Sequence, residues 1–429
     1  MADARTPDQA PSRRWSWTDP AFRSAVIQVS LALVLIWMAW SFFANAQANL
    51  ARQGIASGFG FLENPAGFAI AQTLIPYSES MSYGRAFLVG LLNTLLVAGV
   101  GIVVATILGF LMGVARLSQN VVIKALASAY VEVTRNLPPL FQILFWYMAV
   151  LATMPGPRQS WRIGIQPVVT GLADSMSAIG LSGVGGVLTG LAADLPAPGV
   201  FLSNRGLSMP RPIFEAGSGL VLATLAGGVV VAFLISRWAK ARQEATGQSF
   251  PAFWAGLVAI FAPALLVGAV LGWPVQMEYP ELKGFNFAGG IRIIPELVAL
   301  VLALSVYTAG FIAEIVRAGI IAVSKGQTEA AYSLGLRSGP TLRLVVIPQA
   351  MRVIVPPLTS QYLNLTKNST LGVAVGYPDL FAVFAGTTLN QTGQAIEIIA
   401  ITMAVYLSIS LITSAIMGWF NARVALVER

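Results

Sequence analysis

The chain has 429 residues, of which 56% are hydrophobic and only 10% are charged. Soluble globular proteins carry about 25% charged residues, so most of this surface must face lipid. Cysteine and histidine are both absent, which removes disulfides, thiol nucleophiles, the commonest general base and the commonest metal ligand. An enzymatic function is therefore disfavoured, and the net charge of +8 fits the loops of a membrane protein better than nucleic-acid binding.

Eight segments are apolar over about the 20 residues that a membrane-spanning helix needs. They lie near residues 25–45, 86–115, 128–154, 217–236, 251–273, 295–318, 348–370 and 396–421. The first is too long for a signal-peptide core and follows 24 mostly polar residues, so we expect it to remain in the mature protein. In the seventh, Pro356 and Pro357 interrupt the apolar run, and we expect an irregular path there.

Lysine and arginine set the expected orientation of these spans, because cytoplasmic loops carry an excess of both. With the N-terminus inside, the cytoplasmic positions are Arg5, Arg13, Arg14, Arg23, Arg116, Lys124, Arg237, Lys240, Arg242, Lys325, Arg337, Arg343, Arg352, Arg423 and Arg429. The opposite loops, 48–84 and 155–216, carry few positive residues for their length. Both termini are therefore expected in the cytoplasm. Residues 155–216 are rich in Gly, Ser, Pro and Ala and predict an external domain or cap, with a re-entrant segment as the alternative.

Two pairs of opposite charge lie at i,i+3 spacing on expected helices, Glu132 with Arg135 and Glu314 with Arg317. Both pairs fall near the cytoplasmic ends of their spans, so a structural pairing and a gating role remain alternative interpretations. In the second span, Gly109-x3-Gly113 suits close helix packing, although matches by chance are expected in a chain with 41 glycines. Asn93 and Thr94 in the same span are interpreted as polar contacts between helices.

The segment between the sixth and seventh spans has the features of a capped cytoplasmic helix. Ser324 and Gln327 suit a capping box, and helix-forming residues continue through Glu329, Ala330 and Ala331 to Leu334. Gly335 is placed to end this helix in a left-handed conformation. Ser338 and Pro340 then begin another helix that leads to Pro348. The two adjacent alanines would let another surface approach closely.

A polar cluster follows the two prolines of the seventh span. Lipid would not tolerate it on an exposed face, so a place along a translocation path is the favoured interpretation, with a structural role for the lysine as the alternative. The cluster consists of Asn364, Lys367, Asn368, Ser369 and Thr370.

These motifs together resemble the membrane subunits of binding-protein-dependent ABC importers, in the polar amino acid branch. Residues 329–348, written Glu-Ala-Ala-x3-Gly-x9-Val-x-Ile-Pro, resemble the signature of the loop that binds the ATPase in that family. Residues 130–142, 307–317, 348–350 and 367–371 resemble further family elements. Val345 and Ile347 stand where the family favours Ile and Leu, and both keep an apolar side chain.

The resemblance implies an all-α integral membrane fold with a type I permease core of five helices. Residues 80–155 and 285–429 would form that core, with an ATPase-coupling loop at 319–347. The implied ATPase-coupling residues are Glu329, Ala330, Ala331, Gly335 and Pro348. Residues 1–79 would add a cytoplasmic tail, an extra first span and an external loop. Residues 156–284 would insert an external loop and two further spans, as in some general or glutamate-type amino acid permeases.

The same resemblance implies a multi-pass subunit of the bacterial inner membrane that translocates polar L-amino acids by alternating access. Its partners would be two ABC ATPase subunits, a second permease chain that is homologous but different, an external amino acid-binding protein and membrane lipid. The chain has no Gly-x4-Gly-Lys-Ser/Thr motif, so ATP and Mg would be bound by the ATPase subunits.

Two other classes of protein remain as competing interpretations. A gradient-driven secondary amino acid transporter would more often carry carboxylates along its path, whereas the candidates here lie at helix ends. A membrane scaffold without a path would leave the polar cluster at 364–370 and the capped helix unexplained.

Overall fold

The computed structural model describes residue 17 and residues 20–52, 58–179 and 199–424, together with a few isolated positions between 182 and 189. This part of the chain is mostly helical and contains seven helices that are long and apolar enough to cross a membrane. They span Phe22–Ala46, Tyr83–Ala115, Ser218–Thr246, Ala252–Val270, Pro295–Ile321, Ser338–Val375 and Ala395–Arg423. Seven of the eight expected spans are therefore observed, and the helical membrane fold is confirmed.

The helices are joined by short turns and, in the second half, by irregular helical segments. The α-helices are α1 Pro20–Arg52, α2 Tyr83–Ala115, α3 Val121–Asn136, α4 Pro139–Leu144, α5 Ile165–Ala178, α7 Ser218–Thr246, α8 Ala252–Val270, α9 Pro295–Ile321, α10 Lys325–Ser333, α11 Ser338–Thr341, α12 Ile347–Asn368, α13 Leu389–Thr392 and α14 Ala395–Val424. The π-helices are η2 Phe145–Leu151, η4 Leu342–Val346 and η6 Phe381–Thr388, and the 3-10 helices are η1 Gly60–Glu63, η3 Pro157–Gln159 and η5 Ser369–Val375.

The third expected span, 128–154, is wrong as a continuous helix. Leu137 is extended (φ −95°, ψ 131°) before Pro138, because the proline ring disfavours the helical conformation in the residue that precedes it. The chain therefore divides into α3 and a second helix, α4 with η2, whose apolar part covers only Pro139–Leu151. The Gln142 side chain donates to the carbonyls of Thr134 (2.9 Å) and Leu137 (3.2 Å), which satisfies acceptors that the break releases.

The expected irregular path at Pro356 and Pro357 is also wrong. Helix α12 continues through both prolines from Ile347 to Asn368. Two helical hydrogen bonds are lost at the prolines, and the buried side chains on both sides of them, including Val355 and Leu358, hold the helix against its neighbours.

Glycines allow α2, α9 and α12 to approach closely at the centre of the bundle. A Cβ atom at Gly109 of α2 would lie 2.5 Å from Cβ of Ile312 on α9, and one at Gly113 would lie 2.7 Å from the Ala313 carbonyl oxygen. A Cβ at Gly319 of α9 would overlap Ile354 of α12 in the same way. The Gly109-x3-Gly113 pattern therefore does form a helix-packing contact, as the sequence suggested.

Buried hydrogen bonds join the outer part of α2 to the segment between η5 and η6. Asn93 Nδ2 donates to the carbonyls of Gln72 and Pro378, both at 2.8 Å, and the backbone N–H of Leu380 donates to Thr94 Oγ1 at 3.0 Å. Asn93 and Thr94 therefore make polar contacts within the protein, as expected, but their partners are backbone atoms of non-helical segments and of the residue that precedes η6, and not of another membrane span.

In the described part of the chain, eight short strands gather at one end of the bundle, where the sequence predicted an external domain or cap. They are β1 Trp161–Ile163, β2 Val200–Ser203, β3 Gly206–Met209, β4 Arg211–Phe214, β5 Val275–Glu278, β6 Glu281–Lys283, β7 Asn286–Ala288 and β8 Ile291–Ile293. All pairs are antiparallel: β1-β2-β3-β8 form one sheet, β4 pairs with β5, and β6 pairs with β7. The re-entrant alternative for residues 155–216 stays untested over residues 180–198, most of which lie outside the described residues.

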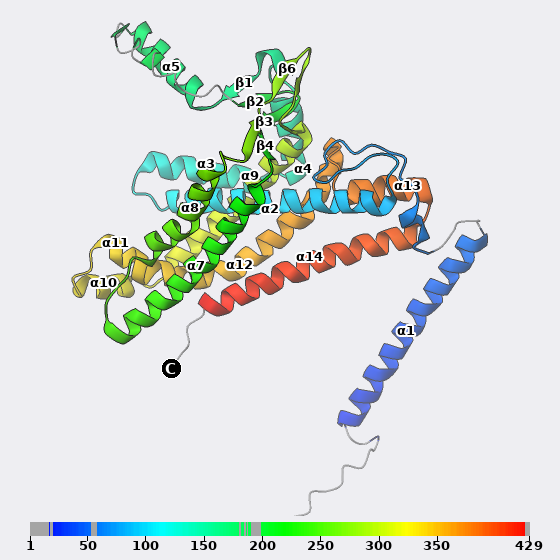
Figure 1. Cartoon of the computed structure of the whole chain (residues 1–429). Coiled ribbons are helices and arrows are strands. Elements are labelled where there is room, and N and C mark those ends of the chain that lie inside the picture. The colour runs from blue at the N-terminus through cyan, green and yellow to red at the C-terminus, as the bar shows by residue number, and fades with distance from the viewer. Residues whose placement is uncertain are drawn as a thin grey trace, which may run out of the picture.

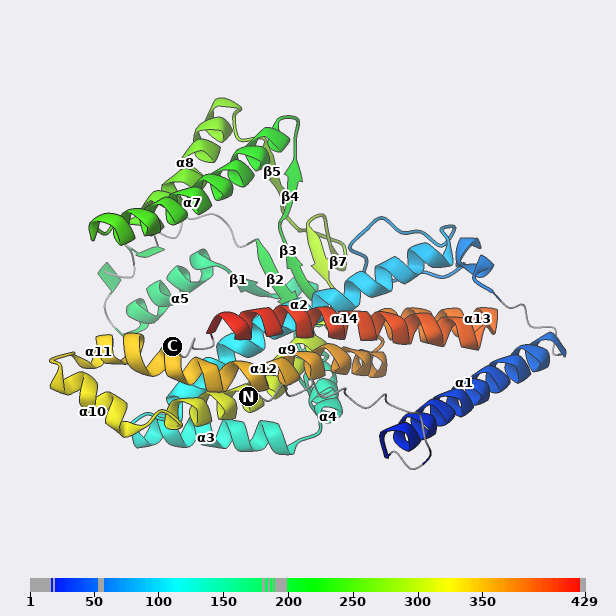
Figure 2. The same cartoon turned by 90° about the horizontal axis from the view of Figure 1, so that it is seen from below.

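The inserted helices α7 and α8 form a hairpin that packs mainly against itself. Gly228 of α7 permits the contact, because a Cβ there would lie 2.5 Å from the Ala259 carbonyl oxygen of α8. In Figures 1 and 2 this hairpin lies along one side of the bundle, with β4 and β5 at its base, while α1 stands apart on the other side. The helices α10 and α11 lie at the end of the bundle opposite the strands (Figure 1).

The α2–α9 contact gives a first prediction. Gly109→Ala should lower the free energy of unfolding by about 1–3 kcal/mol, because the new methyl group cannot fit against Ile312 without displacing one of the helices. Thermal unfolding of the purified protein in detergent measures this effect.

Gly99→Ala is the matched control, because Gly99 lies on the same helix and a Cβ there has no atom within 4 Å. Equal melting temperatures for the two variants would contradict the packing explanation.

Candidate functional site

Helix α10 lies between two membrane spans and exposes one side to solvent. Glu329 and Ala330 are exposed, whereas Ala331 is 4% exposed and packs toward η4. The two alanines therefore point in different directions. Only Ala330 lies on the outer surface, where its small side chain leaves room for a partner. The expectation that both alanines open one face to a partner is wrong in this respect.

The beginning of α10 differs from the expected capping box. Ser324 is the N-cap residue, but its side chain accepts no capping hydrogen bond, and the contact to Gln327 is between backbone atoms at 3.0 Å. The Gln327 side chain instead accepts from Gln349 Nε2 at 3.2 Å. This bond links α10 to the first turn of α12, next to Pro348, so the start of α10 is held by a neighbouring helix.

The end of α10 agrees with the sequence. Gly335 has φ +78°, its N–H donates to the Tyr332 carbonyl at 2.9 Å, and the Leu336 N–H donates to the Ala331 carbonyl at 3.1 Å. A non-glycine residue is strained at this φ, so Gly335 is required by the backbone. A Cβ at Gly335 would nevertheless meet no atom within 4 Å, which makes the requirement purely conformational.

Two large side chains at the end of α10 were not singled out from the sequence. Leu334 is 82% exposed and Tyr332 is 51% exposed, next to the exposed Glu329. An apolar side chain that is almost fully exposed on a cytoplasmic loop is typical of a contact with another protein. The signal in the sequence was their position: both follow the alanine pair and precede the glycine.

A charge cluster joins α2, α3 and α9 near the α10 end of the bundle. Glu314 lies at its centre, hydrogen-bonded to Arg116 of α2 and to Arg317, whose Nη2 is 2.7 Å from Glu314 Oε1. Arg135 of α3 is 3.8 Å away and lies over the Phe311 ring. The Glu314–Arg317 pair is confirmed.

The Glu132–Arg135 pair is wrong, because Arg135 faces Glu314 on α9. Glu132 is exposed and forms no ion pair with Arg135. Arg116 is the member that the sequence missed, since it follows α2 and no carboxylate lies near it along the chain. One carboxylate therefore stands among three guanidinium groups, and its removal would leave uncompensated like charges.

The polar cluster of the seventh span lies at the far end of α12 from α10. Asn364 and Lys367 are exposed, Asn368 and Thr370 are half-buried, and Ser369 is buried with its hydroxyl donating to the Thr366 carbonyl at 2.8 Å. The structure thus brings together only part of the cluster on one surface.

Beyond its first turn, the exposed residues of α12 form a single stripe. They recur at intervals of three and four residues, which places them on one face of the helix. The stripe consists of Val353, Pro356, Pro357, Ser360, Asn364 and Lys367, and the exposed Ile347 and Pro348 in the first turn of α12 lie outside it. Its outer half is polar, which is unfavourable against lipid.

One further carboxylate, Asp379, is fully buried between η5 and η6. Its oxygens accept from the Ala382 N–H at 2.8 Å and from Tyr406 Oη at 3.3 Å. Asp379 holds the start of η6 and was not among the carboxylates that the sequence indicated, which lie at helix ends. Within the described ranges, no group of three or more acidic side chains could hold a metal ion.

Comparisons with known proteins point to one family. Residues 219–426 match the family described as "Binding-protein-dependent transport system inner membrane component". The chain is 48% identical over 428 residues to the general L-amino acid transport system permease protein AapQ of Rhizobium johnstonii, covering 98% of both chains. It is 48% identical to the putative amino-acid ABC transporter permease protein YhdX of Escherichia coli, covering 96% of this chain and 97% of that one. It is also 43% identical to the glutamate/glutamine/aspartate/asparagine transport system permease protein BztB of Rhodobacter capsulatus, covering 96% of each.

The charge cluster gives a second prediction. Glu314→Gln should lower the free energy of unfolding by about 1–3 kcal/mol, a value between those of exposed and buried ion pairs, because the three arginines then repel one another. The thermal unfolding transition in detergent reports the change.

Glu132→Gln removes the same charge from an exposed position of α3 and should leave the transition unchanged. If both variants melted together, Glu314 would not be the centre of a stabilising cluster.

Proposed function

The chain belongs to the family of binding-protein-dependent inner-membrane transport components, and from this membership we propose which of its surfaces bind the partners and the substrate. It is a multi-pass permease subunit of an ATP-driven importer in the bacterial inner membrane, and it is not an enzyme. Membership of this family argues against the alternative of a gradient-driven carrier. The observation that carries the proposal is an exposed helix, α10, that directly follows the buried helix α9.

The proposed substrates are polar L-amino acids. Support comes from the names of the relatives, one a general L-amino acid permease and another a permease for glutamate, glutamine, aspartate and asparagine. Both names specify amino acids as substrates, but they differ in which amino acids are included. The proposal therefore names the class of substrate and no individual amino acid.

The proposed contact with the ATPase is the outer surface of α10, formed by Glu329, Ala330 and Leu334. Its support is the exposure of these residues and the rigid attachment of α10 through Gln327 and Gly335. Two ATPase subunits would bind ATP and Mg, and their closure would move α10. Because α10 follows α9 after three residues, that movement would reach the bundle without a flexible linker.

The proposed translocation path follows the exposed stripe of α12. A second, homologous permease chain would face this stripe and enclose it, which removes the cost of a polar surface in lipid. Lys367 and Asn364 would then offer donors to the carboxylate of an amino acid. The charge cluster around Glu314 would hold α2, α3 and α9 together as the path alternates between its two openings.

Reconstitution tests the function. The chain, with its partner permease and the ATPase subunits, is placed in liposomes, and uptake of labelled amino acids is measured with the external binding protein. Uptake should require both ATP and the binding protein. Uptake by the membrane chain alone, driven by an ion gradient, would contradict the proposal.

The left-handed backbone conformation of Gly335 gives a third prediction. Gly335→Val should reduce ATP-dependent uptake at least tenfold, because a β-branched residue resists φ +78° and the end of α10 must rearrange. The amount of chain inserted in the membrane should stay normal, which immunoblotting of membrane fractions checks.

Gly339→Val is the control, since Gly339 lies in the following helix α11, does not have positive φ and has open space around its Cβ position. Normal uptake by Gly335→Val would show that the conformation of this residue has no role in coupling.

The polar stripe gives a fourth prediction. Lys367→Met keeps the length of the side chain and removes its charge, and should reduce uptake of glutamate about tenfold at low substrate concentration. Lys367→Arg should retain most of the uptake, because the positive charge is kept. An equal loss in both variants would indicate a structural role for Lys367.

A further inference from the structure

The strand region lies at the end of α9 opposite the ATPase-coupling helix. Strand β8 ends at Ile293, two residues before α9 begins, and α10 begins four residues after α9 ends. Helix α9 has 27 residues, so about 40 Å separates the strands from α10. The strands therefore lie on the external side of the membrane if α10 is cytoplasmic.

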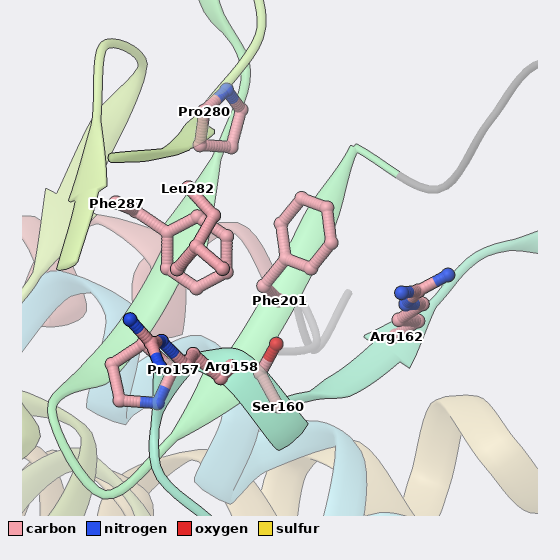
Figure 3. Close-up of a pocket in the computed structure, with 8 residues that line it drawn as sticks. All are labelled: Pro157, Arg158, Ser160, Arg162, Phe201, Pro280, Leu282 and Phe287. Carbon is pink, nitrogen blue, oxygen red and sulfur yellow. The ribbon is translucent and has the colours of Figure 1, made fainter. Parts of the chain in front are cut away.

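A pocket of about 290 Å³ opens in this region, between the four-stranded sheet and the β6–β7 hairpin. It is lined by Pro157, Arg158, Ser160, Arg162, Phe201, Pro280, Leu282 and Phe287. Phe201 of β2 and Phe287 of β7 stack at 4.6 Å and form its apolar floor. Figure 3 shows Arg158 on the Phe287 side of the pocket and Arg162 beyond Phe201.

The charge of this pocket is positive and largely uncompensated. Arg158 donates through Nε to the Gly284 carbonyl at 3.3 Å and lies over the Phe285 ring. Arg162 is exposed and makes no ion pair within the described ranges. None of the described residues that line the pocket is a carboxylate, and Glu281 Oε2, next to the pocket along the chain, is 3.8 Å from Lys283 Nζ.

The sheet continues the positive surface beyond the pocket. Arg162, Phe201, Ser208 and Arg292 are direct neighbours across β1, β2, β3 and β8. They therefore share one face of the sheet. Arg162 and the exposed Arg292 end this row, about 14 Å apart at the usual strand spacing.

The arrangement suits a protein partner better than a small ligand. Sites for small molecules usually enclose about 300–1,000 Å³ and bring their polar groups together around the ligand. Here the two guanidinium groups of the pocket lie on opposite sides of the aromatic pair (Figure 3). Arginine beside exposed aromatic side chains is typical of the centre of a protein interface.

We propose that this pocket binds an acidic side chain of the external binding protein when that protein docks on the permease. The proposal rests on the function proposed above, which requires such a partner. Arg158 would bind the carboxylate of this side chain, since guanidinium groups form strong charge-assisted hydrogen bonds with carboxylates. Arg162, on the other side of the aromatic pair, would attract a second acidic group of the same protein. Phe201 and Phe287 would pack against the aliphatic part of the side chain that Arg158 binds.

The test measures binding of the purified binding protein to the assembled transporter in lipid nanodiscs. The double variant Arg158→Gln/Arg162→Gln should weaken binding about tenfold at low ionic strength. The difference should shrink at 0.5 M NaCl, because salt screens charges at an exposed interface. Arg205→Gln is the matched control: it removes one positive charge from the β2–β3 turn of the same sheet, outside the pocket, and should change binding less than twofold.

Several outcomes would overturn the inference. The inference would be wrong if the wild type and the double variant bound the binding protein with equal affinity. It would also be wrong if Arg205→Gln weakened binding as much as the double variant does. A third arm measures labelled glutamate bound without the binding protein. If the double variant lost only this binding of free glutamate, the pocket would be a site for a free amino acid and the docking proposal would be wrong.

Uptake by the wild-type complex at saturating binding protein is measured in parallel. If that uptake fails, the proposed function fails. If uptake is normal and the double variant binds like wild type, only the docking site is wrong.

Discussion

The close approach of α2 and α9 is the contact on which the rest of the bundle depends. At Gly109 and Gly113 the Ile312 and Val316 side chains of α9 pack directly against the backbone of α2, and Gly319 repeats the arrangement between α9 and α12. In lipid there is little hydrophobic driving force between helices, so such packing supplies much of the association energy. Because α9 leads into α10 after three residues, this contact also sets the position of the surface proposed to bind the ATPase.

Buried polar side chains also hold parts of the bundle together. Asn93 and Thr94 bind backbone atoms of the segment around Pro378 and Leu380, and Asp379 binds the start of η6. The bonds of Asn93 and Thr94 connect α2 with this irregular segment, and the bond from Tyr406 to Asp379 connects it with α14, so its polar groups are satisfied away from water. The non-helical parts of this protein are therefore placed where side chains of neighbouring helices can reach them.

The sequence predicted those features that depend on local chemistry. Span positions followed from runs of apolar residues, and the left-handed conformation of Gly335 followed from its place after a helix-forming stretch. Features that depend on tertiary neighbours could not be predicted. Arg135 pairs with a residue 179 positions away, and Arg116 joins the same cluster from a third helix. The eight strands have only three or four residues each and lie among glycines and prolines, so no alternating pattern was long enough to recognise.

Helix α9 is tied to folded structure at both of its ends. Pairing between β3 and β8 fixes the strand that precedes Pro295, and the Glu314 cluster ties the opposite end to α2 and α3. A helix restrained in this way resists sliding along its own axis, because sliding would have to carry the sheet with it. A tilt of α9 about the sheet would carry α2 and α3 with it, because the Glu314 cluster holds the three helices together. A small change of angle at the sheet would then become a displacement of several ångströms at α10, because the two are separated by about 40 Å of helix.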